Sequence, residues 1–224
     1  MAEHGGGNFA FAPHAGVLPG FFARELGELL TMTALDSTLR LTLPKGLRAT
    51  LLNPYPVDRV GKELTVHLGN MPAGLTLNLV FSMTGRFTGP SAVAPIALEL
   101  DWVEIDSDRR RTLPAIVSPI QVVSPIAFER TRRDDDASEQ VAHIRADRAK
   151  RDAIAHYRAG RHVDARGILN EARAYAMSAP MPASDETVSE LDSLIATDPN
   201  APAFETVRRQ TLNDAHRRSR GREA

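Results

Sequence analysis

The chain has 224 residues, of which 42% are hydrophobic and 25% charged, with a formal net charge of −1 and no cysteine. This composition fits one large or two small folded domains and excludes wholesale disorder, disulfides, thiolate catalysis and cysteine-ligated zinc. The near-neutral charge gives no overall field for nucleic acid or an anionic membrane. With no membrane-spanning apolar run and no signal-peptide pattern, the sequence predicts a cytoplasmic location and leaves secretion open.

The first 35 residues predict one strand and one helix. Alternating Phe9 and Phe11 indicate the strand, and apolar residues spaced by three and four indicate a helix from Leu18 to Leu30. Because two elements cannot bury their own apolar faces, we expect residues 1–35 to pack against the rest of the chain or against a second copy, then as a two-fold homodimer. The interaction candidates are the apolar side chains of this segment: Phe9, Phe11, Phe21, Phe22, Leu26, Leu29 and Leu30.

Residues 36–128 change to an apolar period of two, which is typical of strands with one buried face. Turn sequences separate about seven short runs, with no helical pattern between them, and this predicts an antiparallel β-sandwich. The runs centre on residues 39–43, 47–51, 64–68, 75–83, 96–102, 113–117 and 120–122. Trp102 continues the apolar phase of its run, so we expect it to lie in the sandwich core.

Residues 129–224 begin with a charged linker at 129–136 and then follow helical periodicity. Four helices are indicated, with Gly160 ending the first and Ser184 or Asp185 capping the third. They lie near residues 142–157, 163–177, 185–195 and 204–212. The predicted class is therefore α+β: a strand-helix segment (1–35), a β-sandwich (36–128) and a small helical bundle with a basic tail (129–224).

The sequence contains no complete catalytic or metal motif. His4-Gly5-Gly6-Gly7 matches the oxyanion loop of esterases superficially, but no G-x-S-x-G elbow accompanies it. The seven histidines form no H-E-x-x-H pair, and Asp134, Asp135 and Asp136 are interpreted as charges at a helix start. We therefore predict no catalytic residue, no cofactor and no bound metal.

Four segments carry a family resemblance: MAEHGGGNFAF with VLPGFFARELGELL in residues 1–30, LRLTLPKGL at 39–47, LNPYPV at 52–57 and VHLGNMPAG at 66–74. The first resembles the last strand and helix of a bacterial von Willebrand factor A (VWA) domain. The others resemble the accessory β-sandwich of such proteins, which helices commonly follow. The D-x-S-x-S metal-ion-dependent adhesion site of that family is absent from the chain. The resemblance thus implies a C-terminal fragment or the product of an internal start, and it transfers no metal ligand.

The leading interpretation is a non-enzymatic protein-interaction or scaffold module, the accessory region of a VWA-type protein. One alternative is a hydrolase or transferase whose site assembles from distant residues such as His67, Asp101 and Ser82. Another is a nucleic-acid adaptor that binds through the Arg-rich tail from Arg217 to Arg222, although we expect neither nucleic-acid nor membrane binding. The biological partner is not readable from the sequence.

Overall fold

The computed structural model of the chain describes residues 16, 18–20, 22–23, 27, 31–87, 93–178, 184–197 and 204–219. The described residues 18–20, 22–23 and 27 are helical, as the sequence predicts for this segment, and beyond them strands occupy the first half of the range and helices the second half. The strands are β1 (Met32–Thr42), β2 (Leu47–Leu51), β3 (Val57–Val60), β4 (Glu63–Pro72), β5 (Phe81–Gly85), β6 (Val93–Glu104) and β7 (Arg109–Gln121). The helices are α2 (Pro125–Glu129), α3 (Asp135–Arg158), α4 (His162–Ser178), α5 (Asp185–Ala196) and α6 (Phe204–Ser219). The mixed class predicted from the sequence is confirmed.

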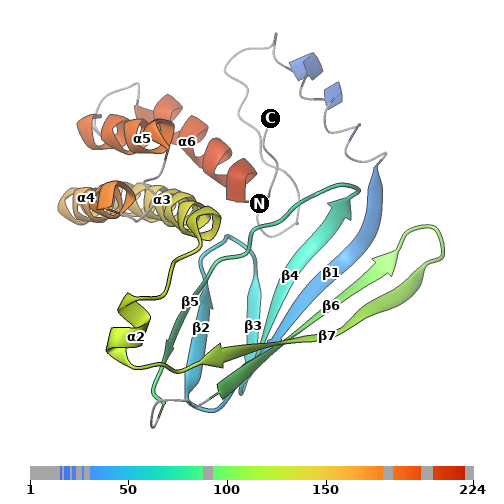
Figure 1. Ribbon diagram of the computed structural model, residues 1–224. Coiled ribbons are helices and arrows are strands. Elements are labelled where there is room, and N and C mark those ends of the chain that lie inside the picture. The colour runs from blue at the N-terminus through green and yellow to red at the C-terminus, as the bar shows by residue number, and fades with distance from the viewer. Residues whose placement is uncertain are drawn as a thin grey trace.

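The described strands form two antiparallel sheets of unequal size (Figure 1). The larger has the order β3-β4-β1-β6-β7, and the smaller pairs β2 with β5. The two sheets share a hydrophobic core, in which Leu41 and Leu64 of the large sheet pack with Ala49 of the small one. Each of these three side chains is almost completely buried.

The alternating run at 75–83 forms a strand only from Phe81 onward. Leu77 and Leu79 still pack against the core, so the alternation correctly indicates burial. The backbone next to them bonds to a side chain instead of a strand: the Asn53 amide oxygen accepts from the Val80 N–H at 2.8 Å, and its nitrogen donates to the Asn78 carbonyl at 2.9 Å. An apolar period of two thus reports side-chain direction and not strand pairing.

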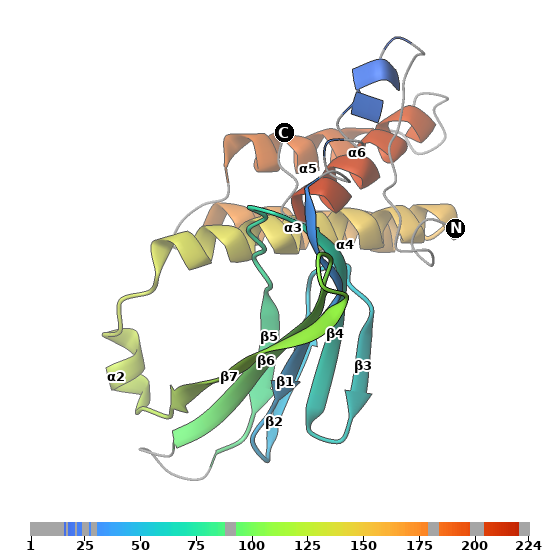
Figure 2. The same ribbon diagram turned by 90° about the vertical axis from the view of Figure 1, so that its right-hand side faces the viewer.

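Helices α3 to α6 surround a core of their own and lie together at one end of the strands (Figures 1 and 2). Ala142, Ala146 and Ala153 place a small-residue face of α3 against Leu169 of α4 and Leu191 of α5. Small residues on one helix allow close approach of its neighbours. The end of β2 and the start of the segment LNPYPV meet this helical region, because the Arg148 and Arg151 guanidinium groups donate to the carbonyls of Leu51 and Leu52 at 3.3 and 3.4 Å.

Helix ends follow the predicted capping chemistry. The Ser184 hydroxyl accepts from the Thr187 N–H and caps α5, as the sequence predicts. Gly160 follows the last residues of α3 with a φ of +73°, a left-handed conformation that glycine adopts without strain. None of the helices within the described ranges is both long and apolar enough to cross a lipid bilayer.

The expectation that Trp102 lies in the core is wrong. Its side chain is half-buried, and it belongs to none of the hydrophobic clusters that the described residues form. The physical reason is the unequal size of the sheets, since a two-stranded sheet covers only part of a five-stranded one.

Candidate interaction surface

The strand β7 and the helix α2 expose a continuous stretch of apolar sequence. From Ile105 to Ala137, only Ile120 and Val122 are half-buried and every other residue is exposed. We define the β7–α2 surface by its large exposed apolar side chains: Leu113, Ile116, Val117, Val123, Ile126 and Phe128. Ile116, Ile126 and Phe128 are 64%, 66% and 60% exposed. Single exposed apolar residues are common, but a run of them in one segment is typical of an interface.

The exposure of β7 follows from its place in the sheet. β7 is the last strand of the five-stranded sheet and pairs only with β6 among the described strands. Pro114 and Pro119 lie within it and have no N–H for a further neighbour, which is typical of edge strands. The strand therefore has no neighbour on its outer edge, and all of its residues except half-buried Ile120 are exposed.

The helix α2 extends this surface away from the sheets (Figure 2). The Ser124 hydroxyl accepts from the Ala127 N–H and caps it, and Pro125 occupies its first turn, where a missing N–H is tolerated. No residue of α2 is buried. A single helical turn is not stable through its own hydrogen bonds alone, so α2 would gain stability from a neighbour that packs against its apolar side chains.

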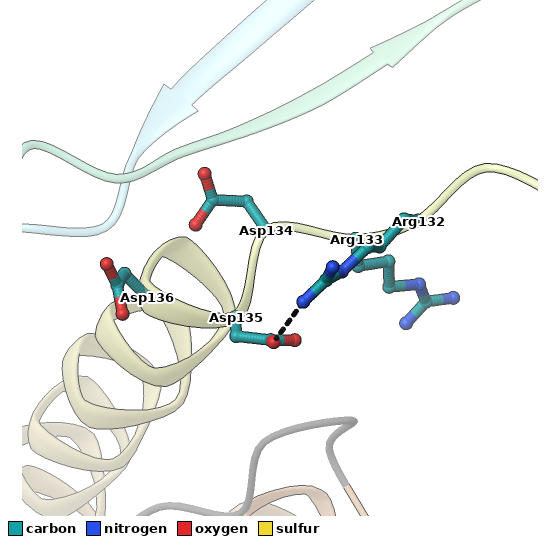
Figure 3. Close-up of a pocket in the computed structure, with 5 residues that line it drawn as sticks. All are labelled: Arg132, Arg133, Asp134, Asp135 and Asp136. Atoms are coloured by element: carbon teal, nitrogen blue, oxygen red, sulfur yellow. Dashed lines mark hydrogen bonds and ion pairs between the residues drawn. The ribbon is translucent and has the colours of Figure 1, made fainter.

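A shallow open depression lies where α3 begins, between Arg132 and Asp136 (Figure 3). The Asp134 carboxylate caps the helix by accepting from the Ala137 N–H at 2.9 Å, as the interpretation of the aspartate triplet predicts. The Arg132 guanidinium pairs with Asp135 at 3.4 Å. The carboxylates thus serve the helix start and a neighbouring arginine.

The solvent face of the large sheet carries a closed network of charges. The Arg40 guanidinium contacts Glu99 at 2.8 Å, Asp101 at 3.3 Å and Glu63 at 3.5 Å. Asp101 is buried and also accepts from the Thr112 hydroxyl at 2.6 Å. Because these groups satisfy one another, the network stabilises strand pairing across the sheet.

At the tip of the β6–β7 hairpin, the Ser107 hydroxyl and the Arg111 guanidinium both donate to the Glu104 carboxylate. These two hydrogen bonds hold the pKa of Glu104 below its usual value, and the bond from Ser107 has the larger effect. The carboxylate is therefore ionised near neutral pH, and its hydrogen bonds stabilise the turn end of the hairpin.

The residues suggested for a dispersed hydrolytic site are brought together only in part. Thr38 is the Cα partner of both His67 and Asp101, so the three lie in one row across the large sheet. Ser82 belongs to the other sheet, where it pairs with Thr50. The His67 ring contacts Asp58 at 2.8 Å. Among the described residues, no group of three or more histidines and carboxylates is placed to hold a metal ion.

Of the interaction candidates named from the sequence, only Phe22 is described, and its side chain is 57% exposed. Phe9, Phe11, Phe21, Leu26, Leu29 and Leu30 lie outside the described residues. The side chains of the basic tail from Arg217 to Arg222 also lie outside them.

The sequence analysis did not predict the β7–α2 surface. The sequence did contain a signal for it. Ile116 and Val117 are adjacent apolar residues that break the alternation, and two prolines in one strand are typical of an edge strand.

Comparison with solved structures finds a shared fold. A von Willebrand factor type A protein from Catenulispora acidiphila is 15% identical, with 87% of this chain and 47% of that one covered and a TM-score of 0.55. The human COPII-coat protein Sec24c is 14% identical, with 91% of this chain and 27% of its own covered and a TM-score of 0.52. The ArnB paralog VWA2 from Sulfolobus acidocaldarius is 15% identical over 97% of this chain and 50% of its own, with a TM-score of 0.48.

The chain spans about half the length of the von Willebrand factor type A structure and about a quarter of Sec24c. The family resemblance found in the sequence is thus supported at the level of the fold, which is VWA-like. No protein-family model and no curated protein matches the sequence.

Proposed function

We propose that the chain is a protein-interaction module that acts by non-covalent contact and not by catalysis. In this proposal it is the accessory β-sandwich and helical bundle of a VWA-type protein, located in the cytoplasm. The observation that carries the proposal is the β7–α2 surface. Burying apolar area contributes roughly 25 cal/mol per Å², so six large side chains left in water favour association.

Two further observations support an interaction role. The charged groups on the sheet face pair with one another, so the polar surface around Arg40 offers closed networks and not open reactive groups. One of the structures that shares the fold is the COPII-coat protein Sec24c. We extend to this chain a place in a protein assembly, and not that coat itself.

The test is site-specific crosslinking of the intact chain in its native cells. A photoreactive phenylalanine derivative replaces Ile116 in one variant and Phe128 in another. The matched control carries the same derivative at Val163 of α4. This apolar residue is 84% exposed and lies outside the β7–α2 surface. We expect discrete crosslinked proteins from the first two positions and none of the same species from the third. Identical patterns at all three positions, or no crosslinked protein at the surface, would contradict the proposal.

A further inference from the structure

The two-stranded sheet lies over only one half of the five-stranded sheet. On one side, the Arg59 guanidinium of β3 donates to the Ala49 carbonyl of β2, and Leu51 of β2 packs with Val66 of β4. On the other side, Phe81 of β5 packs in the same hydrophobic clusters as three side chains of the large sheet, which are Leu98 and Leu100 of β6 and Ile120 of β7. The free edge of β5 therefore faces the β6–β7 half, and Figure 2 shows β5 on the side of α2.

Three side chains that point toward the core remain in solvent along this edge. Leu113 is the Cα partner of Leu100, and Ile116 is the Cα partner of Leu98. Partners in a ladder share a sheet face, and both leucines pack against the core, so Leu113 and Ile116 also face inward. Yet they are 46% and 64% exposed.

In the two-stranded sheet, Met83 also faces the core and is exposed to solvent. It is the Cα partner of Ala49, which is almost completely buried in the core, and it is nevertheless 38% exposed. The interface between the two sheets thus continues beyond β5 as an uncovered apolar strip. We define the open strip by Met83, Leu113 and Ile116, and half-buried Trp102 lies two residues beyond Leu100 on the same face of β6.

The edge of β5 is suited to accept a strand, whereas the edge of β7 is not. Among the described strands, β5 has one neighbour, β2, and its residues Phe81–Gly85 include no proline. Every residue of β5 therefore has an N–H and a carbonyl, whereas β7 lacks N–H groups at Pro114 and Pro119. A strand beside β5 would also lie above the open strip.

The charge of the small sheet indicates what kind of segment fits. Its strands and adjoining turns, residues 44–52 and 81–87, contain Lys45, Arg48 and Arg86 and no acidic residue. All three cations are exposed. A complementary segment would carry carboxylates beside its apolar positions.

We propose that an extended segment of a partner polypeptide, with apolar residues at alternate positions and flanking acidic residues, adds to β5 as a third strand. Its inward side chains cover the open strip and close the sandwich, and its backbone bonds to the free edge of β5. About five residues are needed to match the length of β5. The inference rests on the proposed function and names the class of partner that it implies.

The test selects random twelve-residue peptides displayed on phage against the full chain and measures their affinity by fluorescence anisotropy. We expect enriched peptides to share alternating apolar positions and an excess of Asp and Glu. We also expect weaker binding at high salt. Binding should fall about tenfold or more in Met83→Asp and in Ile116→Asp. Val163→Asp, at an exposed apolar position on α4, should change it less than about twofold.

Amide hydrogen exchange in the complex gives the second readout, because added backbone bonds should slow exchange in β5, which a contact through side chains alone would leave unchanged. Thermal unfolding confirms that each variant remains folded. The absence of enriched peptides, or unchanged exchange in β5, would overturn the proposal. Peptides that lose affinity only in Phe128→Asp would also overturn it, yet would leave the interaction function standing. A dimer of the free chain that Met83→Asp dissociates would assign the strip to a second copy and overturn the proposal.

Discussion

Lys150 has its ammonium group fully buried inside the helical region. It lies 2.7 Å from the Asp147 carboxylate one turn earlier on α3 and also contacts Glu190 of α5. Burying an ammonium without compensation is strongly unfavourable, so these carboxylates are a condition for the side chain to be inside at all. The cluster therefore connects α3 to α5 with a specific register that apolar packing alone would not select.

Replacing Lys150 tests this role. Lys150→Ala removes the cation from two carboxylates, one of them buried, and should lower the free energy of unfolding by about 3–5 kcal/mol. Urea denaturation measures the change. Lys45→Ala, at an exposed turn position, should stay within about 0.5 kcal/mol of the parent. Equal stability of the two variants would show that the buried cluster contributes nothing.

The pKa of Glu104 tests the hydrogen bonds at the tip of the β6–β7 hairpin. Since folding lowers its pKa below the ordinary 4.5, its carboxylate stabilises the hairpin at higher pH, and this contribution is lost as the pH falls through the lowered value. Ser107→Ala removes the largest cause and should raise the pKa of Glu104 toward 4.5. An NMR titration of the carboxyl carbon measures it. Ser118→Ala on exposed β7 is the control and should leave that titration unmoved.

Local chemistry at single residues was largely predictable. The capping role of Ser184 and the helix end at Gly160 follow from short-range backbone chemistry, so the sequence indicates them directly. The burial of Lys150 was not predictable, because it depends on Glu190 reaching it from another helix. The side-chain bonds of Asn53 that replace a strand at 75–80 depend in the same way on a residue distant in sequence.

Among the elements, helix α3 is stabilised at its start by two aspartates that act in different ways. Asp134 accepts from a first-turn N–H, whereas Asp136 lies in the first turn and acts only through the helix dipole. Asp134→Ala should therefore lower the free energy of unfolding by about 1 kcal/mol, and Asp136→Ala by about half as much or less. Chemical denaturation of the two variants compares them. A larger loss for Asp136→Ala would contradict the capping assignment.

The exposure of β7 could not be derived from its apolar pattern. The sequence places Leu113, Ala115 and Val117 in one inward phase, but the pairing of β6 with β7 shifts between Leu98 and Leu100. Beyond this shift, Ile116 and not Val117 shares the face of Leu113. Register depends on the partner strand, and burial depends on whether a second layer lies opposite, so neither is encoded in β7 alone.

At the scale of the whole molecule, the described chain consists of a two-sheet part and a helical part with separate hydrophobic cores. α2 and an exposed linker connect them in sequence. Arg148 and Arg151 connect them in space by donating to the carbonyls of Leu51 and Leu52. The β7–α2 surface thus adjoins the connection between the two parts along the chain, and a partner bound there would contact the segment that links them.

The two arginines should hold the helical part against the sheets. Hydrogen bonds from a charged donor contribute about 1.5–3 kcal/mol each, so the loss of both should weaken the contact between the parts once the linker is cut. A viral protease site inserted between Arg130 and Asp134 allows that cut, and size-exclusion chromatography follows the pieces. We expect the two pieces to elute together in the parent and to separate in Arg148→Ala/Arg151→Ala. The control Arg161→Ala/Arg166→Ala removes two exposed arginines elsewhere in the helical part and should behave like the parent. Separation in the parent would show that the parts do not dock, and joint elution of the Arg148→Ala/Arg151→Ala pieces would show that other contacts hold them.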